Sequence, residues 1–390
     1  MIMSSGNEEH VHLVVRQRRR ISLSLANGWG GAVLTPAVVA RRQESSLLWS
    51  GEWAAFVWSS VPGVALATAA AVGLVPEALA MALFAVSFVG LNLMHMGATW
   101  SRVYVRPGWR PHPVERLAIP VALVSFALTF EAVGGGALLL TAQYFLSFHH
   151  ALMQNYGLLR ASQRRTGRGL DPRLDMAACL LLPGAALLYR AGMVCDRYSG
   201  AVLPSVPMAL VGSLALAGVL ALGAFAWREF QCHRRGERVD PIATGLLFGT
   251  NLMWSAILVG NPHPAMPLYA LASGHYAQYL YVVWHTETRE QAASHTRLAA
   301  RLQSALRSSQ VHYLLVLLAL GGAVTLLLTF VSAGLRTAAV WMSLRPQGAL
   351  DIPAWAAAMI GVNLEHYWLD HRIWRSPRRA LAAATRCAPA

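Results

Sequence analysis

Apolar runs of about 20 residues recur along this 390-residue chain from residue 53 almost to its C-terminus. An α-helix of about 20 residues crosses the roughly 30 Å hydrocarbon core of a bilayer. Backbone N–H and C=O groups must be satisfied inside lipid, so such spans are helices. We therefore predict an all-α, polytopic transmembrane helix bundle of about ten spans. They lie at residues 53–75, 77–98, 115–133, 135–157, 174–194, 207–227, 241–260, 266–285, 311–333 and 351–370.

The composition agrees with a membrane protein. Hydrophobic residues make up 55% of the chain and charged residues only 13%, about half the share in a soluble domain. The net charge is +14, and it comes entirely from arginine because the chain has no lysine. A basic chain can bind nucleic acid, but these arginines lie between the apolar runs. Anionic membrane lipids are therefore the expected partners, and nucleic acid is not.

The positions of the arginines predict the orientation. The loops that would face the cytoplasm, together with the C-terminal tail, hold 22 arginines, whereas the opposite loops hold only Arg190, Arg197, Arg336 and Arg345. Positively charged loops stay on the cytoplasmic side. We therefore expect both termini in the cytoplasm of a bacterium, with the chain in its inner membrane.

The chain ends predict short tails around one membrane domain. Residues 1–50 include a basic run near Arg18 without an apolar stretch within signal-peptide distance, so we expect a disordered cytoplasmic tail. Residues 51–372 would form the transmembrane domain, and residues 373–390 a second cytoplasmic tail.

Histidines inside the predicted spans are the feature that most needs a chemical reason. Charged groups at the centre of a membrane helix cost about 2.5–3.5 kcal/mol each, and such residues are usually functional. Four even-numbered spans, which all run from outside to inside, carry such histidines near the cytoplasmic side. They are His95, His149, His150, His275, His285 and His366. Histidines that several helices bring to one depth are typical of a metal site in a bundle core.

Helical spacing selects among these histidines, since residues three, four or seven apart share a face. His95 shares a face with Asn92 and Thr99, and His150 shares one with Gln154. A ligating imidazole needs a hydrogen-bond partner for its other nitrogen, which nearby amides and carboxylates can supply. We therefore predict His95, His150, His275 and His366 as metal ligands, with His149, His285 and Glu365 as further candidates; Asn92, Gln154, Gln278, Asn363 and Asp370 as partners of the ligands; and Glu365 and Tyr279 as catalytic residues.

Each histidine also has a plainer interpretation. A single membrane histidine can hydrogen-bond across helices, and His, Tyr and Trp near the inner boundary can belong to an aromatic belt. Neither explains why histidines recur on four helices of one orientation, each time beside amides and aromatic residues. A shared site is therefore the better hypothesis.

The side chains available as metal ligands limit which metal could bind and which reaction it could support. The four cysteines, Cys179, Cys195, Cys232 and Cys387, are scattered and lie outside the histidine layer, which argues against thiolate-ligated haem and iron–sulfur clusters. Imidazole donors suit iron, copper or zinc. Histidines with one carboxylate leave positions open for O2 on a non-haem iron. We expect an oxygenase that acts on a lipophilic substrate (a carotenoid, an isoprenoid or an acyl lipid), with an electron donor if the reaction requires one.

Three short segments carry a resemblance to a known family. Leu93-Met94-His95-Met96-Gly97, Phe148-His149-His150 and Tyr279 to His285 are similar to segments of the Brp/Blh family of bacterial membrane β-carotene dioxygenases. The resemblance implies iron bound by intramembrane histidines and cleavage of a carotenoid. Met94 stands where the family has proline, and Arg289 stands where it has a further histidine.

Two other classes of protein remain as alternatives. A haem b protein that exchanges electrons with quinone would use facing histidines as axial ligands. A transporter or proton relay would line a pathway with buried polar residues. The second alternative predicts polar residues across the whole bilayer, whereas here they gather in the inner half of the spans.

Overall fold

The computed structural model describes residues 51–375 with several gaps, and within this part the chain is helical and has no strand. The gaps are residues 106–117, 166–170, 196–205, 238, 264–265, 290–300, 302–303, 305–308, 345, 347–351 and 353. The all-α prediction is confirmed for the described residues. The predicted tails at residues 1–50 and 376–390 lie outside them.

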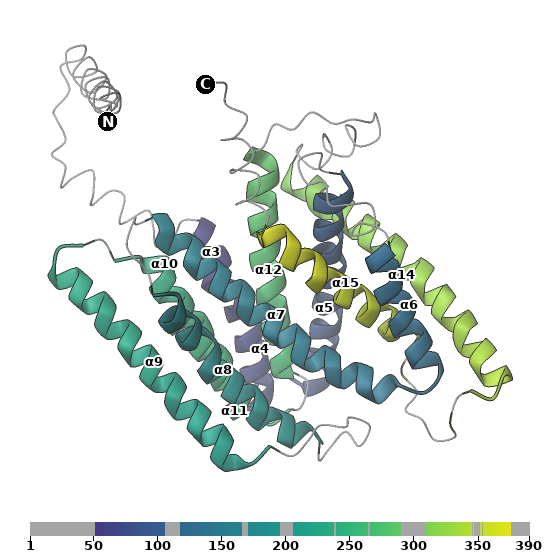
Figure 1. Ribbon diagram of the computed structural model, residues 1–390, viewed down its shortest axis with the longest axis horizontal. Coiled ribbons are helices and arrows are strands. Elements are labelled where there is room, and N and C mark those ends of the chain that lie inside the picture. Colours follow the sequence, from purple (N-terminus) through teal and green to yellow (C-terminus); the bar gives the residue numbers. More distant parts are fainter. Residues whose placement is uncertain are drawn as a thin grey trace, which may run out of the picture. The chain divides into compact units, whose positions relative to one another are not determined.

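The helices follow the predicted apolar runs in chain order (Figure 1). They are α3 (Gly51–Phe56), η1 (Trp58–Ser60), α4 (Val61–Ala71), α5 (Glu77–Trp100), η2 (Ser101–Val105), α6 (Ile119–Ala132), α7 (Gly136–Arg165), α8 (Pro172–Cys195), α9 (Met208–Arg234), α10 (Pro241–Thr244), η4 (Gly245–Asn251), α11 (Leu252–Gly260), α12 (Met266–Arg289), α14 (Gln310–Trp341) and α15 (Ala354–Arg375).

The first predicted span differs from the prediction, because residues 53–75 do not form one helix. The chain makes the short helix α3, a 3-10 turn and then α4, which has a proline in its first turn. Proline has no N–H to continue a preceding helix, so a new helix starts there. By contrast, α10, η4 and α11 follow one another without a break from Pro241 to Gly260. Asp240 caps this segment by accepting bonds from the N–H groups of Ile242 and Ala243.

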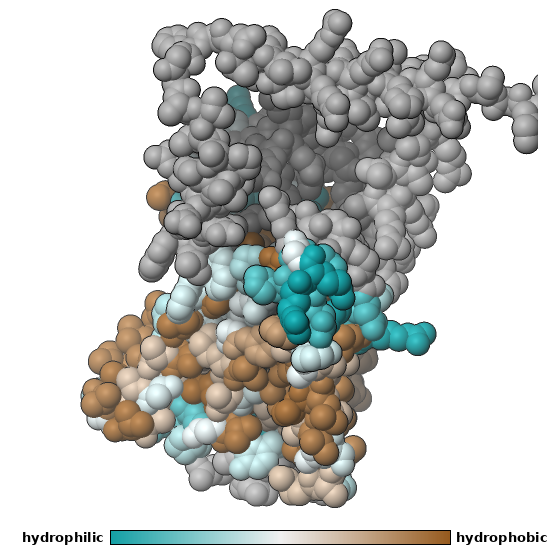
Figure 2. All heavy atoms as spheres, turned by 90° about the vertical axis from the view of Figure 1, so that its left-hand side faces the viewer, coloured by the Kyte–Doolittle hydropathy of each residue, from teal (hydrophilic) through white to brown (hydrophobic). Residues whose placement is uncertain are grey.

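Five helical segments are long and apolar enough to cross a bilayer, which indicates a membrane protein. They are Glu77–Val103, Pro172–Ala191, Met208–Arg234, Pro241–Gly260 and Gln310–Trp341. Large apolar side chains on α9, including Leu216, Leu220 and Trp227, are exposed, and Figure 2 shows hydrophobic side chains gathered on this side of the bundle. Such a surface would promote aggregation in water, but it is compatible with contact to lipid.

Helix α5 lies at the centre of the helices that matter for the site. It packs against α4, α12, α14 and α15, and α15 also packs against α7. The approach of α14 to α5 depends on glycine: a Cβ on Gly97 would collide with the carbonyl of Leu317, and one on Gly321 with the carbonyl of Leu93. Small residues allow membrane helices to pack this closely. The contact fixes the position of α5, which carries His95.

Buried ion pairs connect helices at both ends of the bundle. The Arg336 guanidinium donates two bonds to the buried Glu131 carboxylate, at 2.7 Å and 3.2 Å, and joins α14 to α6. The Asp175 carboxylate on α8 accepts from Arg160 on α7 at 2.8 Å and from Arg228 on α9 at 2.7 Å. Charge-assisted bonds of this kind orient helices because each buried carboxylate needs the partly buried guanidinium as its partner.

Candidate metal centre

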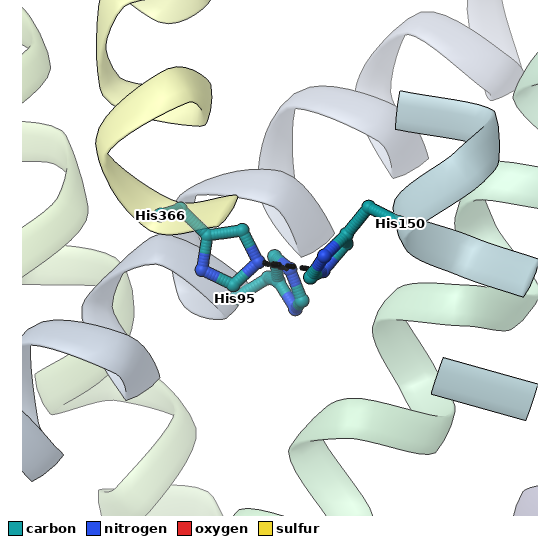
Figure 3. Close-up of side chains that lie close together, drawn as sticks. All are labelled: His95, His150 and His366. Carbon is teal, nitrogen blue, oxygen red and sulfur yellow. Dashed lines mark hydrogen bonds between the residues drawn. The ribbon is translucent and has the colours of Figure 1, made fainter. Parts of the chain in front are cut away.

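Three histidines from three different helices converge on one point (Figure 3). His95 on α5 and His366 on α15 are buried, and His150 on α7 is half-buried. The Nε2 atom of His366 lies 2.7 Å from Nε2 of His95 and 3.1 Å from Nε2 of His150. The ligand atoms of all three lie within 4.8 Å of one another. This group, His95, His150 and His366, is called the triad below.

Hydrogen bonds among the three imidazoles cannot satisfy all three Nε2 atoms, whereas a metal ion could. A neutral imidazole has one N–H and one lone pair, so Nε2 of His366 cannot make a full hydrogen bond with both neighbouring Nε2 atoms. A metal ion accepts all three lone pairs at once. Nitrogen ligands about 2.0–2.1 Å from a tetrahedral ion lie about 3.3 Å apart, close to the 3.1 Å between His366 and His150 and longer than the 2.7 Å between His366 and His95. The residues present therefore could hold a small transition-metal ion.

Hydroxyl and carboxylate groups from α5, α12 and α15 adjoin the triad. Thr99 Oγ1 lies 2.7 Å from His366 Nδ1 and 2.8 Å from the Tyr279 hydroxyl. Tyr279 donates to Asp370 Oδ1 at 2.8 Å. The second carboxylate oxygen, Oδ2, lies 3.6 Å from His366 Nε2 and 3.7 Å from His150 Nε2. A negative charge next to two of the triad nitrogens favours a bound cation.

His275 lies beside the triad but does not belong to it. Its ring centroid is 5.0 Å from that of His95 and 5.1 Å from that of His150, and the residue is buried on α12. Its Nδ1 atom has no hydrogen-bond partner among the residues that the structure describes. His275, the predicted fourth ligand, therefore lies beside the triad, and its ring is in contact with the rings of His95 and His150.

The structure does not bring His149, His285 and Glu365 into this group. His149 lies on an exposed face of α7. The His285 ring packs against Tyr281 with centroids 4.2 Å apart, and ten helical residues separate it from His275 by about 15 Å. Glu365 is buried, and its carboxylate accepts a bond of 3.1 Å from Trp100 Nε1. Helix rotation separates His149 and Glu365 from the triad, and distance along α12 separates His285.

The amides that we predicted as partners of the imidazoles mostly brace helices instead. Gln278 donates to the Phe56 carbonyl at 2.8 Å and accepts from Gln154 at 3.1 Å. Gln154 also donates to the His275 carbonyl at 3.1 Å. Asn92 makes a long contact of 4.0 Å with the sulfur of Met359 on α15, and Asn363 is buried on the same helix. Among the predicted partners, Asp370 is the one whose side chain reaches the triad.

Three residues that the sequence analysis did not assign as site residues line the centre. Thr99 bonds to His366, although its spacing of four from His95 was visible in the sequence. The Tyr276 ring lies 4.8 Å from that of His95, and the Tyr367 ring lies 4.6 Å from that of His150. Both tyrosines adjoin a predicted ligand in sequence, and this adjacency is the signal that could have identified them.

Comparisons with known protein families, with curated proteins and with solved structures find no match. The similarity of three short segments to the Brp/Blh family thus stays a prediction. The chemistry of the site must be argued from its own residues.

Proposed function

We propose that this chain is an integral membrane metalloenzyme, a non-haem iron oxygenase that acts on a lipophilic substrate. The observation that carries the proposal is the triad: three imidazoles from three helices, each with a ligand nitrogen within 4.8 Å of the others. Nitrogen donors with a neighbouring carboxylate suit iron, and copper or zinc would accept the same donors. No cysteine joins the group among the described residues, which supports imidazole-ligated metal over thiolate chemistry.

Each residue around the site would have a distinct task. His95, His150 and His366 would hold the ion, and Asp370 would offset its charge from 3.6–3.7 Å. Bound iron would supply the one-electron chemistry that O2 needs to react with an unactivated C–H or C=C bond, and an electron donor would serve where the outcome requires one. Tyr276 and Tyr367 would present aromatic faces to an apolar substrate.

The surroundings of the site support a lipophilic substrate. The triad lies in a helix bundle with candidate membrane spans, so a molecule dissolved in the bilayer could enter between helices without crossing water. Carotenoids, isoprenoids and acyl lipids share this property, and the resemblance to the Brp/Blh family favours the first.

The proposal includes ten spans with both termini in the cytoplasm of a bacterium, in its inner membrane. Helices α7, α12 and α15 are less apolar than the five candidate spans because they carry the polar residues of the site and of its supporting network. Those side chains include His150, His275 and His366, which are turned toward other helices. A helix that buries its polar face in the bundle can still span lipid. The arginine distribution supplies the orientation.

The spacing of the nitrogens favours a single-ion site over a haem b. Two axial imidazoles of a haem stand on opposite sides of the macrocycle, whereas here three Nε2 atoms face one another at 2.7 Å and 3.1 Å. Insertion of a porphyrin between them would require the helices to separate. The geometry therefore supports the non-haem centre.

The experiment compares two neighbouring histidines. Protein purified in detergent should contain near-stoichiometric iron and no Soret band, and His150→Ala should lose the iron and the oxidation of added lipophilic substrates under O2. His149→Ala is the matched control, since His149 is exposed on the same helix and its loss should change neither. A Soret band, or folded wild-type protein that binds no metal, would refute the proposal.

A further inference from the structure

A continuous chain of side-chain hydrogen bonds runs from one triad histidine to the carboxylate beside it. It passes from His366 Nδ1 to Thr99 Oγ1 at 2.7 Å, from Thr99 to the Tyr279 hydroxyl at 2.8 Å, and from Tyr279 to Asp370 Oδ1 at 2.8 Å. All four residues are buried. The chain joins α5, α12 and α15, and its two ends both lie next to the point where the triad converges.

The Tyr279–Asp370 bond determines which group donates and which accepts in every hydrogen bond of this series. Tyr279 donates its single hydroxyl proton to Asp370 Oδ1, so it can only accept from Thr99. Thr99 gives its single proton to Tyr279 and therefore accepts from His366. It follows that His366 carries its proton on Nδ1 and a lone pair on Nε2.

One contact competes with this order. Thr99 Oγ1 also lies 3.5 Å from the carbonyl oxygen of His95, one helical turn earlier. That distance is at the limit of a hydrogen bond, whereas the two side-chain contacts of Thr99 are 2.7 Å and 2.8 Å. The hydroxyl proton is therefore better placed toward Tyr279 than toward the helix backbone.

We propose that Thr99 and Tyr279 are positioning residues that hold His366 in its Nδ1–H tautomer and so direct the Nε2 lone pair at a bound ion. The inference rests on the proposed metal site and deepens it. In the other tautomer, Nε2 of His366 would carry the proton and would have no lone pair to offer to an ion. The hydrogen-bond chain disfavours this tautomer.

The same chain orients the carboxylate. With Oδ1 held by Tyr279, Asp370 presents Oδ2 to His366 and His150 at 3.6 Å and 3.7 Å. One sequence of bonds thus sets both the tautomer of a ligand and the direction of the nearest negative charge. Loss of the Tyr279 hydroxyl should weaken both effects, whereas loss of the Thr99 hydroxyl should weaken the control of the tautomer.

The test measures zinc affinity of metal-stripped protein in detergent by competition with a chromophoric chelator. Thr99→Val keeps the shape of the side chain and removes the hydroxyl, and we expect zinc to bind roughly 10–100-fold more weakly, the usual effect of losing a partner of a metal ligand. Thr99→Ser restores the hydroxyl and should restore the affinity. Thr141→Val is the matched control, because that hydroxyl bonds only to the Ala137 carbonyl in its own helix and should leave zinc binding unchanged.

Tyr279→Phe tests the next link and serves if the valine variant does not fold. The double variant Thr99→Val/Tyr279→Phe should bind zinc no more weakly than the worse single variant, because both changes break one chain. Nitrogen NMR of histidine-labelled, metal-free protein should show neutral His366 with its proton on Nδ1 in the wild type. In Thr99→Val it should show a mixture of the two neutral tautomers, with the proton on Nδ1 or on Nε2.

The outcomes separate this inference from the proposed function. Wild-type protein that folds but binds no zinc or iron would remove the metal site itself. Zinc binding that is equal in wild type, Thr99→Val and Tyr279→Phe would overturn the positioning role and leave the metal site intact. Independent, additive losses in the double variant would also contradict a single chain.

Discussion

The contact between α5 and α14 can be tested with two adjacent glycines of α14. A Cβ on Gly321 would collide with the Leu93 carbonyl, whereas a Cβ on Gly322 would meet nothing within 4 Å. Replacing glycine by alanine inside a helix stabilises it by about 0.5–1 kcal/mol when there is space. Overpacking costs about 1–3 kcal/mol. The helix gain is common to both variants, so Gly321→Ala should be about 1–3 kcal/mol less stable than Gly322→Ala.

The assay is reversible unfolding of the detergent-solubilised protein by an SDS titration followed by circular dichroism. Gly322→Ala should match or exceed the wild type, and Gly321→Ala should fall below it. A second pair repeats the comparison on α5, where Gly97 faces the Leu317 carbonyl and Gly90 has open space. Equal stability within each pair would show that the close approach of the two helices does not limit packing, and the reasoning would be wrong.

A further prediction concerns charge. Asp175→Asn should destabilise the bundle by about 3–5 kcal/mol, since it leaves Arg160 and Arg228 without their shared carboxylate. Glu237→Gln, which changes the exposed pair with Arg235, should have almost no effect on the SDS titration.

The sequence predicted the helices well because lipid imposes a simple rule. A run of about 20 apolar residues must be helical, and helical segments cover each of the predicted runs in the described part of the chain. The exception was residues 53–75, where proline divides the run into short helices. The number of spans and their orientation stay predictions that rest on the arginines.

The sequence also indicated which residues gather at the centre. His95, His150 and His366 were predicted as ligands and lie together, with His275 beside them. The spacing with Gln154 favoured His150 over His149, and the structure places His149 on an exposed face. The residues lie together because periodicity within one helix determines which residues share a face, and their role as metal ligands stays a prediction.

Only the tertiary structure decided how the faces meet. Asp370, expected as a partner of the ligands, lies beside two imidazoles, while Glu365, five residues earlier and expected as a ligand or catalytic residue, contacts Trp100 instead. The link through Thr99 and Tyr279 needs three helices at matched depths and rotations. Helix periodicity leaves each helix free to rotate about its axis and to slide along it. Packing removes that freedom, here through contacts such as Gly97 and Gly321 against the backbone of the facing helix.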